Sequence, residues 1–145
     1  MNLAPLSGPA ASPGPSGQPG SAQAREIADL KARDQQVRAH EAAHLTAAGG
    51  LARGGASYTY ERGPDGVAYA VGGEVGIDTS PVPGNPAATL AKAQRIQAAA
   101  LAPADPSSQD RSVASAASAM AAQAQRELQR AQTGRASGRS LDVVA

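Results

Sequence analysis

Two histidines and a glutamate lie close together in the segment VRAHEAAHL, which spans residues 37–45. His40 and His44 are the only histidines in the chain, and Glu41 directly follows the first of them. On a helix of about 3.6 residues per turn, side chains four positions apart share one face and can present two imidazole nitrogens to one cation. Glu41 lies on the same broad side, where a carboxylate can accept a proton from a water molecule that a metal activates. The pattern HEAAH therefore predicts a zinc (Zn2+) site with His40 and His44 as ligands and Glu41 as the catalytic base of peptide hydrolysis.

A short motif of this kind also has a simpler interpretation. Five-residue patterns occur by chance, and histidines on an apolar stripe are often only buried and hydrogen-bonded. Two features favour the metal site. No histidine occurs elsewhere in the chain, and a glutamate on a buried helix face is costly without a function or a partner.

A third protein ligand for the metal has to be a carboxylate, because the chain has no cysteine and no further histidine. Glu74 is the first choice, since the glycines around it let a helix and a metal approach the backbone closely. Asp78 is the second choice, and Asp105 and Asp110 are the third. Each has a simpler reading: Glu74 as a solvated strand residue, and the last two aspartates as helix caps or first-turn charges.

The composition limits what the rest of the chain can do. The 145 residues include no tryptophan or phenylalanine, so the core has to come from alanine, valine, leucine and isoleucine, which predicts one small domain. A formal net charge of +1 argues against a nucleic-acid or membrane partner. No signal peptide or transmembrane segment is recognised, which predicts a cytoplasmic location. The expected partner is a peptide or protein substrate, and the oligomeric state is left open.

The first helical pattern has to position the HEAAH motif. Residues 1–21 are rich in Pro, Gly and Ser and are predicted to be a disordered leader. Apolar residues then recur at helical intervals and predict a helix over 22–48, with Ser21 as its cap and Gly49 and Gly50 at its end.

An alternating pattern follows and predicts a β-hairpin whose turn contains Pro64, Asp65 and Gly66. On its second strand one face carries the larger apolar residues, namely Val67, Tyr69, Val71, Val75 and Ile77. The opposite face has small residues and two carboxylates, Glu74 and Asp78.

Two further helices complete the predicted domain. Asn85 as cap and Pro86 in the first turn predict a helix over 86–101, and an apolar stripe predicts another over 106–132. Residues 133–145 are predicted to form a flexible tail. The predicted organisation is thus a leader over 1–21, an α+β metallopeptidase domain over 22–132 and a tail over 133–145.

The chain resembles the SprA-related metalloprotease family of bacterial proteins. The resemblance covers about residues 29 to 118 and rests on three segments: LKARDQQVRAHEAAHLTAAGG, GGASYTYERGPDGVAYAVGGEVGIDTSPV and ALAPADPSSQDRSVA. It implies a small zincin-like domain and a zinc-dependent peptidase, with His40 and His44 as ligands and Glu41 as the base. The leader and the tail lie outside the resemblance.

A noncatalytic zinc-binding or protein-interaction module is the alternative function. The small predicted domain favours it, because a peptidase needs a cleft that orients an extended substrate. The hairpin supplies a possible wall for such a cleft, since the edge of a sheet can pair with a substrate backbone.

Overall fold

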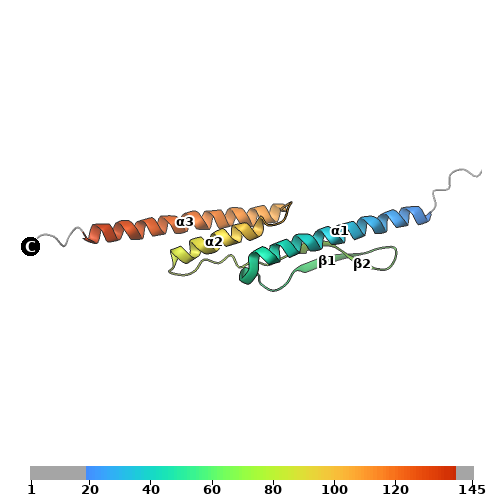
Figure 1. Ribbon diagram of the computed structural model, residues 1–145, viewed down its shortest axis with the longest axis horizontal. Coiled ribbons are helices and arrows are strands. Elements are labelled where there is room, and N and C mark those ends of the chain that lie inside the picture. The colour runs from blue at the N-terminus through green and yellow to red at the C-terminus, as the bar shows by residue number, and fades with distance from the viewer. Residues whose placement is uncertain (1–18, 140–145) are drawn as a thin grey trace, which may run out of the picture.

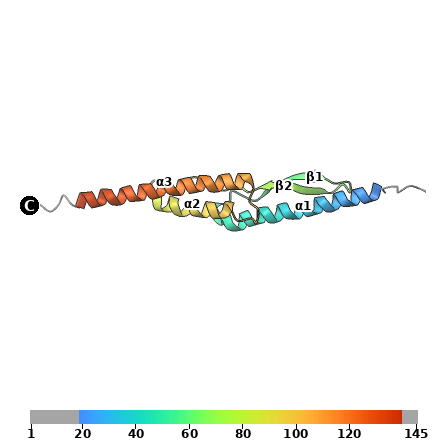
Figure 2. The ribbon, with the colours of Figure 1, turned by 90° about the horizontal axis from the view of Figure 1, so that it is seen from above.

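The computed structural model describes residues 19–139, which form three α-helices and one two-stranded antiparallel sheet (Figure 1). The elements in chain order are α1 (Pro19–Ala48), the short 3-10 helix η1 (Gly49–Leu51), β1 (Ser57–Arg62), β2 (Ala68–Glu74), α2 (Pro86–Ala100) and α3 (Ser108–Arg139). The α+β class predicted from the sequence is confirmed. The arrangement is elongated: the hairpin lies along α1, α2 lies along α3, and the two pairs meet in the middle (Figure 2).

The long helices extend further than the sequence pattern predicts. α1 begins at Pro19, so Ser21 lies inside the first turn and its predicted role as the cap is wrong. A proline suits this position because its fixed φ angle is helical and its missing N–H is not needed there. Residues 1–18, most of the predicted leader, lie outside the described residues.

α3 likewise differs from its prediction at both ends. It begins at Ser108 and continues to Arg139 through two glycines, so the helix predicted over 106–132 starts later and ends later than the sequence pattern indicates. Each glycine costs only about 1 kcal/mol relative to alanine, and the alanines, arginines and glutamines around them favour a helix. Residues 140–145 lie outside the described residues.

α2 has the predicted start and packs closely against α3. The Asn85 side chain accepts a hydrogen bond of 2.9 Å from the Ala88 N–H, and Pro86 is the first helical residue. The helix ends at Ala100, one residue before the predicted end. Ile96 is its largest fully buried side chain, and most other buried positions of the two helices are alanines: Ala93, Ala99, Ala100, Ala114, Ala117 and Ala124. These small side chains let the two backbones approach each other.

The hairpin has the predicted turn, but its second strand does not have one apolar face. The Gly66 N–H donates to the Gly63 carbonyl at 2.9 Å, and Gly66 adopts a φ of 77° that favours glycine. A β-bulge lies between Thr59 and Tyr60 of β1 and leaves Val71 without a partner. Tyr69 and Ala70 precede the bulge in regular register and are both buried, and the extra residue Val71 shifts the alternation of sides from Gly72 onward.

The predicted apolar and small-residue faces are therefore wrong as assigned. Ala70, from the small-residue set, is fully buried, whereas Val67, from the apolar set, is 50% exposed. The strand is aligned by its contacts with α1. The Ala70 N–H donates to Asp34 Oδ1 at 2.8 Å, and Arg33 Nε donates to the Val71 carbonyl at 3.1 Å.

The chain after β2 pairs with the segment that follows α1. The Arg53 N–H donates to the Gly76 carbonyl at 2.7 Å, and the Asp78 N–H donates to the Leu51 carbonyl at 2.8 Å. These bonds hold the continuation of β2 beside the end of the HEAAH helix. None of the helices within residues 19–139 has both the length and the hydropathy needed to cross a membrane.

Candidate metal centre

The two histidines of HEAAH project from α1 towards one point, as the sequence predicts. Their Nε2 atoms lie 3.2 Å apart. His44 Nδ1 lies 2.9 Å from the Ala99 carbonyl, which can only accept a hydrogen bond. Nδ1 of His44 therefore carries the proton, and its Nε2 presents a lone pair. Such a carbonyl partner is typical of histidines that bind metals, because it fixes both the tautomer and the ring orientation.

Asp110, in the first turn of α3, supplies a carboxylate to the same point. Its Oδ2 lies 3.2 Å from His40 Nε2, and its Oδ1 lies 3.2 Å from His44 Nε2. One ligand atom from each of the three residues lies within 4.8 Å of the other two. Within residues 19–139 no other set of histidine, aspartate or glutamate side chains converges in this way.

The carboxylate of Asp110 is held in place by the start of its own helix. The Ser107 N–H donates to Asp110 Oδ2 at 2.7 Å, and the Asp110 N–H donates to Ser107 Oγ at 3.1 Å. This reciprocal pair is a capping box with aspartate in the third position. Burial acts to raise the pKa of Asp110, but the hydrogen bonds from Ser107 and the nearby imidazoles outweigh it and leave the pKa below its usual value. The carboxylate is therefore ionised at neutral pH, as a metal ligand has to be.

The three residues fit a zinc ion by chemistry and by spacing. Two histidines and one carboxylate form a donor set that catalytic zinc sites use, with the fourth position open to water or substrate. Ligand atoms at 2.0–2.1 Å from a tetrahedral zinc are about 3.3 Å apart, and the two imidazole nitrogens, at 3.2 Å, are close to this separation. Each nitrogen also lies 3.2 Å from a different oxygen of Asp110. With one oxygen of Asp110 as the ligand, the three ligand atoms lie within 4.8 Å of one another.

Glu41 lies beside this group without being part of it. Only 3% of the residue is exposed, and its Oε2 atom is buried with no hydrogen-bond partner among the described residues. Burial raises the pKa of the Glu41 carboxyl, an effect that the two histidines partly oppose. Buried polar atoms without a partner are rare in folded proteins, so Glu41 Oε2 is an acceptor that the described residues leave unused.

Gly73 of β2 makes room for the Glu41 side chain. A Cβ atom at Gly73 would lie 2.8 Å from Glu41 Cγ and 2.9 Å from Oε1, too close for any other residue without a shift. The glycine therefore lets the strand lie directly against the carboxylate. The sequence predicted that glycines here allow close approach, and the group that approaches is the side chain of Glu41.

The predicted third ligand, Glu74, lies near the group but outside it. It is exposed at the end of β2, and it lines the same cavity as His40, His44 and Asp110. Asp105 lines a second cavity, which shares His40 and Glu41 with the first. Of the carboxylates considered from the sequence, Asp110 is the one that lies against both histidines.

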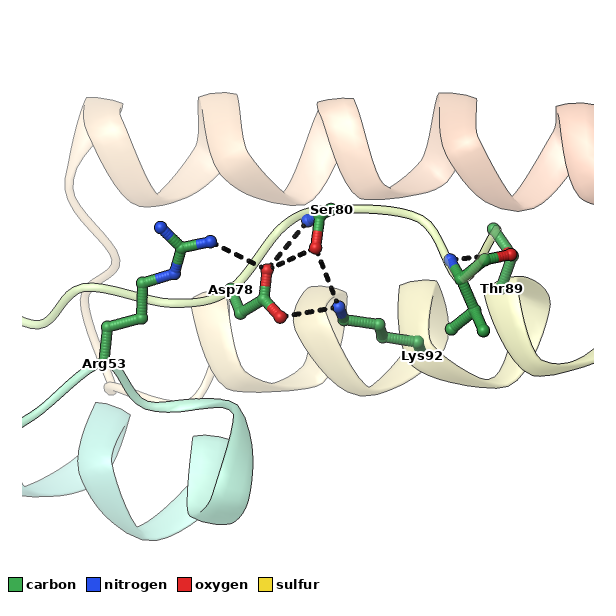
Figure 3. A network of polar contacts seen from close by, with 6 residues as sticks. Arg53, Asp78, Ser80, Thr89 and Lys92 are labelled. Atoms are coloured by element: carbon green, nitrogen blue, oxygen red, sulfur yellow. Dashed lines mark hydrogen bonds and ion pairs between the residues drawn. The ribbon is translucent and has the colours of Figure 1, made fainter. Parts of the chain in front are cut away.

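Asp78, the second choice from the sequence, is engaged elsewhere. Its carboxylate accepts hydrogen bonds from Arg53 Nη2 at 3.0 Å and Lys92 Nζ at 2.8 Å (Figure 3). The Ser80 hydroxyl donates to it at 2.6 Å as well. These donors hold the pKa of Asp78 far below its usual value. Because its oxygens already have cationic partners, Asp78 is poorly suited to binding a metal.

Fold and site together define a small α+β protein in which the two histidines of an HEAAH helix, α1, meet an aspartate from the start of α3. The sequence profile of the SprA-related family matches residues 17–145. The chain belongs to the SprA-related family, so the resemblance seen in the sequence is confirmed at the level of the family. Neither a curated protein nor a solved structure matches it.

Proposed function

We propose that this protein is a zinc-dependent metallopeptidase. The observation that carries the proposal is the convergence of His40, His44 and Asp110 on one point, with the buried, unpartnered carboxylate of Glu41 beside them. When bound, a zinc ion supplies Lewis-acid chemistry that activates water and polarises a carbonyl at neutral pH. Peptide bonds are the proposed substrate because the HEAAH pattern is typical of zinc peptidases.

Asp110 is the proposed third ligand, in preference to Glu74. It lies 3.2 Å from each imidazole, and the capping box restrains it, so little side-chain entropy is lost on binding. Glu74 is an exposed side chain at the end of a strand. Its place in the same cavity suits contact with a substrate.

Glu41 is the proposed general base. Its raised pKa makes it a stronger base than an ordinary carboxylate, and its position on α1 keeps it beside the ligands without joining them. After accepting a proton from water, the same carboxyl can donate it to the leaving amine. Contact with Gly73 restricts the side chain to this location.

The arrangement of α1 and β2 supports the proposal that the fold is zincin-like. A helix carries both histidines and the base, and one strand lies along it at the level of the base. The zincin-like fold, the bacterial origin and the cytoplasmic location stay predictions from the sequence.

Metal analysis together with hydrolysis tests the proposal. Protein purified without added metal is expected to hold about one zinc per chain and to hydrolyse an unfolded protein substrate in a reaction that a chelator stops. The variants His40→Ala and His44→Ala should lose both properties. Equal zinc content in wild type and variants would contradict the metal site. Zinc binding without hydrolysis would instead identify the noncatalytic module.

A further inference from the structure

A second cavity, which Glu74 does not line, adjoins the candidate metal centre. Its volume is about 800 Å³, and it lies between α1, the glycines of β2 and the segment 102–107 that leads into α3. We name it the arginine cavity, because Arg33 of α1 and Arg111 of α3 both line it. It shares His40 and Glu41 with the cavity that contains Glu74. A group in the arginine cavity is therefore directly next to the proposed base.

The two arginines are held in place from different parts of the chain. Arg33 Nε donates to the Val71 carbonyl at 3.1 Å, and Arg111 Nη1 donates to the Pro106 carbonyl at 2.5 Å. Each of these bonds uses one of the five N–H donors of a guanidinium. Among residues 19–139 the other donors of both side chains have no protein acceptor. Two anchored guanidinium groups with free donors are suited to binding a carboxylate.

The charged lining of the cavity is balanced in number. It consists of two cations, Arg33 and Arg111, and two carboxylates, Asp105 and the proposed base Glu41, besides His40 of the metal centre. The free guanidinium donors, and not a net positive charge, are therefore what suits the cavity to a carboxylate. Neither arginine forms an ion pair with an acidic side chain in the described part of the chain.

We propose that the arginine cavity binds a carboxylate of the substrate next to the peptide bond that is cut. This inference rests on the proposed peptidase function and names its substrate class: peptides with an acidic group beside the scissile bond. The carboxylate has two possible sources, an aspartate or glutamate side chain within a chain, or the C-terminal carboxylate of a peptide. Arg33 and Arg111 are then specificity residues, and the chemistry stays with Glu41 and the metal ligands.

Direct binding to the full-length protein tests the proposal without requiring hydrolysis. The probes are N-acetyl-glutamate methylamide, its neutral glutamine counterpart and N-acetylglycine, which has only a terminal carboxylate. Binding is followed by NMR at the arginine Nε–H groups. A probe with a carboxylate should shift the signals of Arg33 and Arg111 and bind about tenfold or more tightly than the glutamine probe, because charge-assisted hydrogen bonds are lost with the neutral amide. Preference for the glutamate probe or for N-acetylglycine identifies the source of the carboxylate.

Variants locate the effect in the cavity. Arg33→Gln and Arg111→Gln should each weaken carboxylate binding, whereas the matched control Arg130→Gln, on the exposed part of α3, should not. The proposal would be overturned if the wild type bound neither carboxylate probe more tightly than the glutamine probe, and this comparison needs no variant to fold. Carboxylate binding that survives both cavity variants would also overturn it.

Hydrolysis then separates this proposal from the peptidase proposal. With peptide pairs that differ only by glutamate or glutamine beside the cut bond, Arg33→Gln and Arg111→Gln should raise KM for the acidic peptide and leave kcat nearly unchanged. If the wild type shows selective carboxylate binding without hydrolysis, the peptidase proposal fails and the carboxylate site stands. If the wild type cuts both peptides equally well and binds neither carboxylate probe more tightly than the glutamine probe, the carboxylate site fails and the peptidase proposal stands.

Discussion

The candidate metal centre and the Asp78 cluster are both groups of polar side chains that join distant segments, yet their charges are arranged in opposite ways. In the Asp78 cluster one carboxylate receives donors from Arg53, Lys92 and Ser80 (Figure 3). The negative charge is thereby surrounded by cations and hydroxyls that are part of the chain. Such a cluster is complete and needs no ligand.

The metal centre brings together acceptors instead. Imidazole nitrogens and a carboxylate face one another at 3.2 Å, and the buried carboxylate next to them has an oxygen without a partner. No lysine or arginine contributes an ion pair to this group in residues 19–139. Closeness of polar groups therefore does not by itself point to a site, and the convergence of acceptors without a lysine or arginine is what supports the proposed metal centre. Four substitutions test this difference.

Replacement of the base should have the largest effect. Glu41→Gln keeps the size of the side chain but cannot accept a proton, so kcat should fall by about 100- to 10,000-fold. Zinc content, measured by atomic absorption, should stay at the wild-type level because Glu41 is not a ligand. Hydrolysis at the wild-type rate by this variant would rule out Glu41 as the base.

The second-largest effect is expected when the proposed third ligand, Asp110, is replaced. Asp110→Asn keeps an oxygen for the Ser107 N–H but loses the negative charge. Zinc affinity should fall by about 100-fold or more, because even the loss of a residue that only hydrogen-bonds to a metal ligand lowers affinity by about 10- to 100-fold. Glu74→Gln is the matched control and should leave the affinity unchanged. The opposite result in a zinc competition titration would identify Glu74 as the ligand.

Substitution of Gly73, which packs closely against Glu41, should have an intermediate effect. Gly73→Ala forces a methyl group against Glu41, where the nearest side-chain atoms would be 2.8 to 3.1 Å away. The displaced carboxylate should reduce kcat by up to about 100-fold, and the crowding should destabilise the fold by about 1–3 kcal/mol. Gly72→Ala is the control, because a Cβ atom there meets only Thr59 at 3.7 Å. If both variants keep full activity in the same assay, contact with Gly73 does not position the base.

The smallest effect is expected from a substitution in the Asp78 cluster. Asp78→Asn should lower the melting temperature slightly and leave zinc affinity unchanged. Because the pKa of Asp78 is lowered in the folded state, its contribution is present above the unfolded pKa of about 3.9 and is lost as the pH falls below that value. The difference in melting temperature between wild type and variant should therefore be present at pH 7 and shrink in acid. A difference that is constant from pH 7 to pH 3 would show that the charge of Asp78 does not stabilise the fold.

Some features of this protein follow from the sequence alone, because local geometry decides them. Helical spacing places His40 and His44 on one face with Glu41 beside them. The start of α2 follows from an asparagine cap and a following proline, and the hairpin turn follows from the residues that suit it. In each case the interacting groups are only a few residues apart, so the regular backbone fixes their distance.

Other features depend on tertiary packing. Asp110 is 70 residues from His40, and the sequence ranked it only as a third-choice ligand, with a helix cap or a first-turn charge as its simpler interpretation. Only the packing of α2 against α1 and α3 brings that cap, and the Ala99 carbonyl, to the imidazoles. The bulge at Val71 is a second case, because it shifts the strand alternation on which the choice of faces depended. Sequence spacing determines which side chains share one element, whereas the docking of elements far apart in the chain decides which carboxylate completes the cluster.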